Sequence, residues 1–250
     1  MKNLYWRPLL LACQFLTSLP IQGRDQIEDA DVGRSFLWYP LVGLLIGGLL
    51  WGFSQLAAAV LPTLLIAVLV VTLWALITGA LHLDGLADSA DAWIGGFGNR
   101  ARTLEIMKDP TCGPVGVVTL VMLLLIKVAA IHQLLQMSSG AGLILVPVVG
   151  RLGVIVLFLT TAYVRAGGLG EALANHFSRS GAWRVVAITA VLLILATPVS
   201  GSCALLVCAA VFWLMRRQML ARLAGCTGDT AGALIEILEV SALITLAALA

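Results

Sequence analysis

The chain has 250 residues, of which 60% are hydrophobic and only 11% are charged. A soluble globular domain carries about a quarter of charged residues, so this composition excludes an ordinary soluble protein and indicates an integral membrane protein. The formal net charge of +2 is small, and we expect no nucleic-acid partner. The five cysteines form no CxxC pair, so neither a disulfide framework nor structural zinc is implied.

The N-terminal segment is apolar but short. Residues 4–20 carry Arg7 and Pro8, and they predict an interfacial or re-entrant helix instead of a crossing. The first apolar run also lacks a signal-peptide cleavage pattern. The polar segment 21–34 has nearly balanced charges, and we expect a solvated loop with these carboxylates in water: Asp25, Glu28, Asp29 and Asp31. Arg34 lies closer to the membrane and is a candidate for a phosphate contact.

Apolar segments make up most of the remaining chain. They predict an all-α, polytopic helix bundle with about seven transmembrane helices, formed as a single membrane domain over residues 1–250 in a lipid bilayer. In chain order the segments are 35–60, 63–81, 115–133, 143–164, 185–199, 203–215 and a last one that ends at Ala250. The fifth and sixth are expected to form a hairpin that breaks at Pro198 and Gly201.

Residues 35–60 contain two glycine pairs at small-xxx-small spacing, Gly43 with Gly47 and Gly48 with Gly52. Such pairs let a neighbouring helix approach closely. We expect helix packing from them, and they also permit a homo-oligomer.

The distribution of Lys and Arg predicts the orientation in the membrane. With the N-terminus inside, the loops 82–114, 165–184 and 216–232 fall on one side. They carry Arg100, Arg102, Lys108, Arg165, Arg179, Arg184, Arg216, Arg217 and Arg222, whereas the turns near 61, 138 and 200 carry no Lys or Arg. By the positive-inside rule this side is the cytoplasm. We therefore expect a multi-pass protein of the bacterial inner membrane whose active-site loops, 82–114 and 216–232, face the cytoplasm.

Residues 79–114 form the longest polar interruption of the chain. Asp84, Asp88 and Asp91 follow one another at steps of four and three, which places three carboxylates on one face of a helix. Oxygen ligands at this density suit a hard cation that also holds a phosphate, so we predict Mg²⁺. The alternative, a solvated acidic helix face, is less favoured because charge is scarce in this chain.

A glycine-rich loop follows, with Gly95, Gly96 and Gly98. Glycines let backbone N–H groups approach a phosphate. Nearby side chains add the candidates for compensating charge, Arg100, Arg102 and Lys108, and two further carboxylates, Glu105 and Asp109. His82 adjoins the acidic stretch, and either a substrate hydrogen bond or local packing would account for it.

A second charged group lies near the C-terminus, with members Arg222, Asp229, Glu236 and Glu239. Glu236 and Glu239 fall inside an otherwise apolar helix, so a metal ion, a substrate cation or Arg222 is expected beside them. Lys127 and Arg151 lie within apolar spans. Each is a functional-site candidate, with snorkelling or a structural ion pair as the alternative.

Carboxylates, arginines and glycines at a membrane surface suit displacement at a pyrophosphate. The DGLADSAD run partly resembles the start of the CDP-alcohol phosphotransferase motif, but Asp88 stands where that motif has Arg, and the later GxxxDxxxD is absent. The DxxxD of Asp84 and Asp88 also resembles the intramembrane prenyltransferases, whose second DxxxD is missing. A transporter or channel subunit is the alternative from another class, although no internal repeat is evident.

A closer resemblance covers nearly the whole chain. The sequence resembles the cobalamin synthase (adenosylcobinamide-GDP ribazoletransferase) family in FLTSLP (15–20), YPLVGLLIG (39–47), ALHLDGLADSADAW (80–93), EIMKDPTCGPVGV (105–117) and GCTGDTAGALIEILE (225–239). The run 80–93 and EIMKD are the most specific parts. Pro114 departs from the family pattern, and the family varies around residues 110–112, so no role is transferred to these positions.

The resemblance implies a transferase that joins α-ribazole, or its 5′-phosphate, to adenosylcobinamide-GDP with release of GMP, and it implies Mg²⁺ as cofactor. Mapped onto this chain, the expected metal ligands are Asp84, Asp88 and Asp91. The expected substrate-binding residues are His82, Arg100, Arg102, Lys108 and Arg222. Glu105, Asp109 or Asp229 would orient the nucleophile, and which of them acts as base stays open. Glu236 and Glu239 would complete a second metal site or serve a structural role.

Overall fold

A computed structural model describes residues 6–21, 28–137, 139–165, 167 and 169–250. Over these residues the chain forms helices and no β-strand, apart from one isolated parallel bridge between Tyr163 and Cys226. The all-α prediction is confirmed. Asp25, which was predicted to lie in a solvated loop, falls outside the described residues.

The helices are, in chain order, α1 (Trp6–Leu16), α2 (Asp29–Ser35), α3 (Tyr39–Ala57), α4 (Thr63–Ile77), α5 (Leu81–Gly95), α6 (Arg100–Ile106), α7 (Pro114–Gln136), α8 (Val146–Thr160), α9 (Leu169–His176), α10 (Arg179–Ala196), α11 (Pro198–Leu223) and α12 (Gly228–Ala248). Among the described residues, 6 helices are long and apolar enough to cross a membrane, or 7 if the bent pair α4–α5 counts as one span. The predicted polytopic bundle is therefore confirmed.

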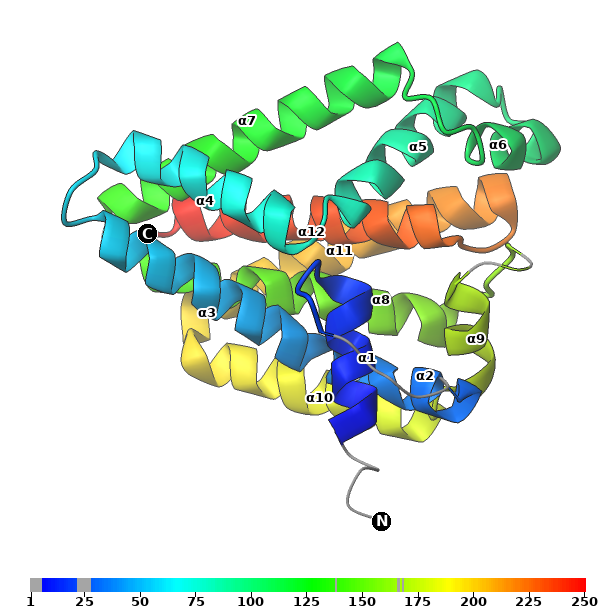
Figure 1. Ribbon diagram of the computed structural model, residues 1–250, viewed down its shortest axis with the longest axis horizontal. Coiled ribbons are helices and arrows are strands. Elements are labelled where there is room, and N and C mark those ends of the chain that lie inside the picture. The colour runs from blue at the N-terminus through cyan, green and yellow to red at the C-terminus, as the bar shows by residue number, and fades with distance from the viewer. Residues whose placement is uncertain (1–5, 22–27, 138, 166, 168) are drawn as a thin grey trace.

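The long helices run along a common direction, with their connections gathered at the two ends (Figure 1). One end holds α6, α9 and the turn before α12, and the other holds the turns that follow α3 and α7. The helix α1 runs across this direction and, with 11 residues, is too short to cross a bilayer. This geometry agrees with the predicted interfacial or re-entrant helix.

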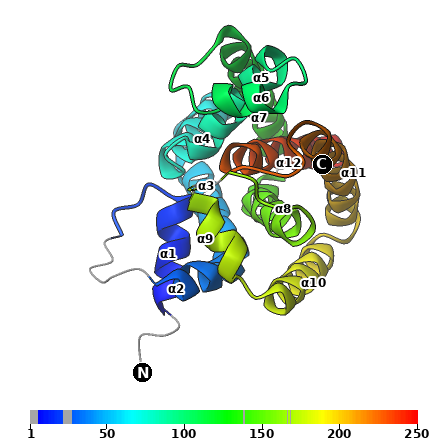
Figure 2. The same ribbon diagram turned by 90° about the vertical axis from the view of Figure 1, so that its right-hand side faces the viewer.

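Burial separates central from peripheral helices. In Gly140–Thr160, which includes α8, 78% of the most apolar window is buried, and in α12 the value is 67%. The corresponding value is 17% in both α10 and α11. The view along the bundle accordingly shows α8 and α12 enclosed by the other helices (Figure 2). Leucines of α10 and α11 such as Leu195 and Leu206 remain exposed, as lipid-facing side chains are.

A sharp bend separates α4 from α5. The two helices meet at 89°, and Gly79 and Ala80 adopt positive φ values of 60° and 56° between them. The backbone N–H of Ser18 donates to the carbonyl of Ile77 at 2.7 Å, which ties the segment after α1 to this bend. The span predicted to continue to residue 81 thus ends at Ile77, and α5 turns away from it.

The predicted loops 21–34 and 165–184 each contain a helix, α2 in the first and α9 in the second. Residues 29–35 form α2, and Asp31 is buried in it, 3.4 Å from Arg34, so the expectation of a solvated loop is wrong there. The backbone of Gly33 contacts His176 of α9 too closely for a Cβ atom. Because α2 packs on α9, these residues gain a helical partner that local polarity does not reveal.

The C-terminal hairpin also differs from the prediction. It breaks at Thr197, and α11 begins with Pro198, whose missing N–H costs nothing at a helix start. Gly201 lies inside α11 and packs closely on the carbonyl of Leu193. The helix continues to Leu223, so most of the predicted loop 216–232 is helical and only residues 224–227 form a turn.

Candidate active site

The site begins where α5 crosses α12. A Cβ atom on Gly85 would lie 2.7 Å from the carbonyl oxygen of Asp229, and one on Gly232 would lie 3.3 Å from the Cα of His82. Small residues permit this close approach of two helix backbones. The crossing brings Asp84, next to Gly85, to the beginning of α12.

The beginning of α12 is held by a short turn. Val164 donates its N–H to the carbonyl of Cys226, and Cys226 donates to Ala162, so the turn is paired with the segment after α8. Thr227 and Thr230 then cap the helix reciprocally. Asp229 falls in the first turn, where the helix dipole favours a carboxylate.

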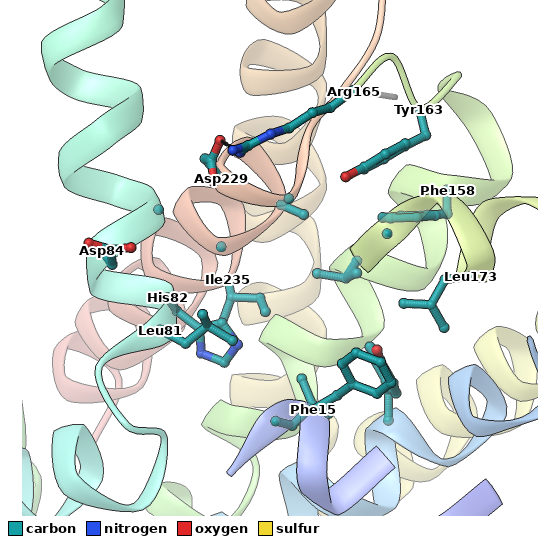
Figure 3. Close-up of a pocket in the computed structure, with 18 of the residues that line it drawn as sticks. Phe15, Leu81, His82, Asp84, Phe158, Tyr163, Arg165, Leu173, Asp229 and Ile235 are labelled. Atoms are coloured by element: carbon teal, nitrogen blue, oxygen red, sulfur yellow. Dashed lines mark hydrogen bonds and ion pairs between the residues drawn. The ribbon is translucent and has the colours of Figure 1, made fainter. Parts of the chain in front are cut away.

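Asp84 and Asp229 line one cavity of about 540 Å³ (Figure 3). Two cations, Lys108 and Arg165, line it as well. We call these four charged residues the rim. Below the rim the wall is largely apolar, with Phe15 of α1, Phe158 of α8, Leu173 of α9 and Ile235 of α12 among its side chains. The two acidic segments therefore line one cavity, as the prediction of a single site requires.

Arg165 was not among the predicted site residues. Its guanidinium donates to the Asp229 carboxylate at 2.6 Å, and it also lines an adjoining cavity of about 620 Å³ that contains Glu171 and Arg179. Tyr163 and Phe158 line both cavities. The available sequence signal was an arginine directly after an apolar span and before a glycine-bearing segment.

The three aspartates of α5 have different surroundings. Asp84 is exposed at the rim, and Asp88 is half-buried one turn further on, within electrostatic range of Asp84, Asp229 and Arg165. Asp91 instead accepts hydrogen bonds from the backbone N–H groups of Gly113 at 2.7 Å and Gly116 at 2.9 Å. Asp91 thereby caps the first turn of α7 and joins it to α5.

The carboxylates of α5 fit a Mg²⁺ site in part. Magnesium is usually held by one or two carboxylates together with substrate phosphates and water, and Asp84 and Asp88 supply two such carboxylates one helical turn apart. Among the described residues, no three His, Cys, Asp or Glu side chains are close enough to form a metal site. A site made from all three aspartates is therefore not preformed, and the metal role of these residues stays a prediction.

Several predicted residues lie away from the cavity. Arg102 and Glu105 form an exposed ion pair at 2.9 Å on α6, and Arg100 is exposed at the start of the same helix. Asp109 is exposed and accepts hydrogen bonds from the N–H and hydroxyl of Thr111, which lower the pKa of its carboxyl group. Among the predicted candidates from residues 100–109, only Lys108 lines the cavity.

Arg222 is used at a different place from that predicted. It donates to the carbonyl of Trp93 at 2.5 Å and lies 5.4 Å from the centroid of that ring. Its contact holds the end of α5 against α11. The predicted pairing of Arg222 with Glu236 or Glu239 is wrong.

Glu236 and Glu239 are buried with two cations. Lys127 contacts Glu236 at 2.7 Å and Glu239 at 3.0 Å, and Arg151 also bonds to Glu239. We call these four residues the buried charge cluster. Lys127 in addition lies 4.1 Å from the centroid of the Trp74 ring. Lys127 and Arg151 are thus paired inside the protein, and the cluster joins α4, α7, α8 and α12.

Known proteins resemble this chain over nearly its whole length. The sequence profile of the Cobalamin-5-phosphate synthase family matches residues 8–247. The chain is 54% identical over 242 residues to the adenosylcobinamide-GDP ribazoletransferase of Pseudomonas savastanoi pv. phaseolicola, covering 97% of this chain and 99% of the relative. It is 53% identical over 240 residues to the protein of the same name from Pseudomonas fluorescens strain Pf0-1, covering 96% and 98%. No solved structure matches the chain. The family profile and these relatives cover nearly all of the sequence, and the chain belongs to the cobalamin-5-phosphate synthase family.

Proposed function

We propose that this protein is an adenosylcobinamide-GDP ribazoletransferase. It joins one ribose hydroxyl of α-ribazole, which is also free in the 5′-phosphate form, to the β-phosphoryl group of adenosylcobinamide-GDP and releases GMP. The names of the relatives support the substrates. The observation that carries the proposal is the cavity in which carboxylates of two distant segments, Asp84 and Asp229, meet two cations above an apolar wall.

The residues of α5 provide the expected metal site. Asp84 and Asp88 would hold Mg²⁺, and Asp91 would fix the position of α5 through its two bonds to the start of α7. When bound, Mg²⁺ neutralises phosphate oxygens and so makes the phosphorus more open to attack.

The rim residues have complementary roles in the displacement. Arg165 and Lys108 bind the phosphate oxygens of the diphosphate, and their charge stabilises the departing GMP. Asp229 orients the attacking hydroxyl and accepts its proton as the new oxygen–phosphorus bond forms and the bond to GMP breaks. Because Asp229 is bonded to Arg165 in the free protein, substrate binding must transfer Arg165 from Asp229 to a phosphate.

The membrane orientation is part of the same proposal. The beginning of α12 and the segment after α8, which carry the rim residues Asp229 and Arg165, lie at the end of the bundle that also holds α6 and α9 (Figure 1). Basic side chains of this end include Arg100, Arg102 and Arg179, and the positive-inside rule assigns them to the cytoplasm of the cell. In a bacterial inner membrane, the site would then open to the cytoplasm, which supplies nucleotides.

A transporter is the weaker alternative. The charges within the spans that suggested a polar path pair with one another as the buried charge cluster. No contact in the described residues favours a CDP-alcohol phosphotransferase over the proposed transferase.

The test is release of GMP by the purified protein in lipid nanodiscs, supplied with adenosylcobinamide-GDP, α-ribazole and Mg²⁺. We expect one GMP for each cobalamin formed, with loss of both products when the metal is chelated and recovery when Mg²⁺ is restored. The Asp84→Asn protein is the matched inactive control. Absence of GMP from a folded protein with both substrates intact would refute the proposal, and full activity in chelator would refute its metal requirement.

A further inference from the structure

The cavity has two chemically different parts. Charge is confined to the rim, whereas the wall beneath it is built from side chains of α1, α8, α9 and α12, including Phe15, Leu16, Val154, Leu173 and Ile235. Its volume of about 540 Å³ lies within the roughly 300–1,000 Å³ of pockets that enclose small molecules. A nucleoside is a ligand of this size class.

His82 brings one unsatisfied polar group to this wall. The side chain is 4% exposed, and among the described residues its Nδ1 has no hydrogen-bond partner. His82 points from the first turn of α5 toward Ile235 (Figure 3). A neutral imidazole carries one N–H donor and one acceptor nitrogen, and buried polar groups without a partner are uncommon in folded proteins. A ligand that bonds to His82 would remove this deficit.

We infer that the apolar part of this cavity binds the bicyclic aromatic base of α-ribazole, and that His82 donates a hydrogen bond to the unsubstituted ring nitrogen of that base. The inference rests on the proposed function and adds the location of one substrate and a specificity-determining residue. In this position the ribose faces the rim, with its attacking hydroxyl toward Asp229.

The chemistry of the base distinguishes it from the other aromatic groups of the reaction. A dimethylbenzimidazole presents two methyl groups, apolar ring faces and a single free acceptor nitrogen, which matches apolar side chains and one donor. Guanine carries several donors and acceptors on its edge, and this wall would leave most of them unpaired at a large cost. The adjoining cavity, which contains Glu171 and Arg179, provides polar surroundings for the nucleotide end of the larger substrate.

The first test fills the cavity. Leu173→Trp places a larger ring in the wall, and binding of α-ribazole alone is measured by calorimetry on the protein in nanodiscs. We expect the Kd to rise at least about tenfold, while the KM for adenosylcobinamide-GDP changes little. Leu206→Trp is the matched control, because Leu206 is 72% exposed on α11 and distant from the cavity wall. An unchanged Kd in a folded Leu173→Trp protein would overturn the inference.

The second test addresses the hydrogen bond and does not depend on the tryptophan variant being stable. The probe is the matching dimethylindole riboside, in which a C–H group replaces the ring nitrogen. The unmodified protein should prefer α-ribazole about tenfold. His82→Phe should bind the two ribosides equally, and His82→Gln, which retains an N–H donor, should recover part of the preference. A preference that persists in His82→Phe would overturn the assignment of His82.

Failure of this inference is separate from failure of the proposed function. Binding of α-ribazole is measured without the second substrate, whereas GMP release requires both. An active enzyme whose cavity holds a co-purified lipid acyl chain, seen by native mass spectrometry and not displaced by α-ribazole, would overturn the inference and leave the transferase activity in place.

Discussion

The helix α12 carries acidic residues in two very different settings. Asp229 lies in its first turn at the rim of the cavity, and Glu236 and Glu239 lie about two and three turns further along in the buried charge cluster. The same residue types on one helix therefore serve different purposes. What separates them is whether the protein itself supplies enough positive charge.

In the buried charge cluster the charges are balanced. Two carboxylates meet the ammonium group of Lys127 and the guanidinium of Arg151, and the side chains are 4% exposed or less. An unpaired charge at this depth in a membrane protein is very unfavourable. Since its members come from α7, α8 and α12, the cluster fixes how these helices pack.

Around the rim the charges are less completely paired, because Asp88 on α5 adds a third carboxylate to those of Asp84 and Asp229, against the two cations Lys108 and Arg165. The carboxylates of Asp84, Asp88 and Asp229 repel one another, and Arg165 bonds to only one of them. Asp84 remains exposed. An excess of carboxylates that water or a cation must compensate is typical of a binding site, whereas a neutral buried cluster is typical of structural support.

The largest effect is expected from a substitution in the rim. Asp84→Asn removes an exposed charge from the predicted metal site, so turnover should fall about 10³-fold or more while the unfolding temperature stays the same. Asp91→Asn is the contrasting variant. Its carboxylate bonds to two backbone N–H groups, so we expect a lower unfolding temperature from a loss of about 1.5–3 kcal/mol. GMP release and thermal unfolding in nanodiscs measure the two effects, and near-normal turnover of Asp84→Asn would remove it from the metal site.

The next largest effect is expected from a substitution in the buried charge cluster. Lys127→Met leaves Glu236 buried without its cation, and we expect the free energy of unfolding to fall by about 3–5 kcal/mol. Adding Glu236→Gln removes the uncompensated charge, so the double variant should recover much of this loss. Denaturation in mixed detergent measures both proteins. Equal stability of Lys127→Met and the unmodified protein would show that the cluster is not structural.

Sequence reasoning works best where a feature depends on residues that are close together in the chain. Spacing placed Asp84 and Asp88 on one face of a helix, and both lie on α5. This spacing is local, so sequence reveals it. The partners of Glu236 and Glu239 come from two other helices and are separated from them by 88 to 112 residues, and no local pattern encodes such a pairing.

The errors of the fold prediction have the same origin. The polar segment that contains Asp31 is helical because α9 covers one side of it. Arg216 and Arg217 remain in α11, which extends beyond its apolar part, and Arg216 donates hydrogen bonds to Thr160 and Thr161 at the end of α8. Arg165 was missed because its importance depends on the pairing of its segment with the turn at Cys226.

A smaller effect is expected from substitutions in the two glycine pairs of α3. Gly47 packs against the turn that precedes α8, and a Cβ atom on it would lie 2.3 Å from the carbonyl oxygen of Ile144. A Cβ atom on Gly48 would have no neighbour within 4 Å among the described residues. Gly47→Leu should therefore destabilise the protein by about 1–3 kcal/mol through overpacking, and Gly48→Leu should not. Thermal unfolding measures the difference at low protein concentration. A loss in Gly48→Leu that depends on protein concentration would instead place this face in a homo-oligomer.

The smallest effect concerns Asp109, which sequence analysis placed among the possible bases and the structure places in solvent. Hydrogen bonds from Thr111 lower the pKa of this carboxyl group, so it is ionised at neutral pH. Asp109→Asn should change kcat/KM by less than about twofold, whereas Asp229→Asn should lose most activity.

The lowered pKa also predicts how the contribution of Asp109 to stability changes with pH. Since the folded state holds the proton of Asp109 more weakly than the unfolded state, its stabilising effect is present above the unfolded pKa and disappears as the pH falls through the folded one. Unfolding temperatures of Asp109→Asn and the unmodified protein should therefore converge at acidic pH. A large loss of activity in Asp109→Asn at neutral pH would return Asp109 to the site and would require α6 and the following loop to move toward the rim when substrate binds.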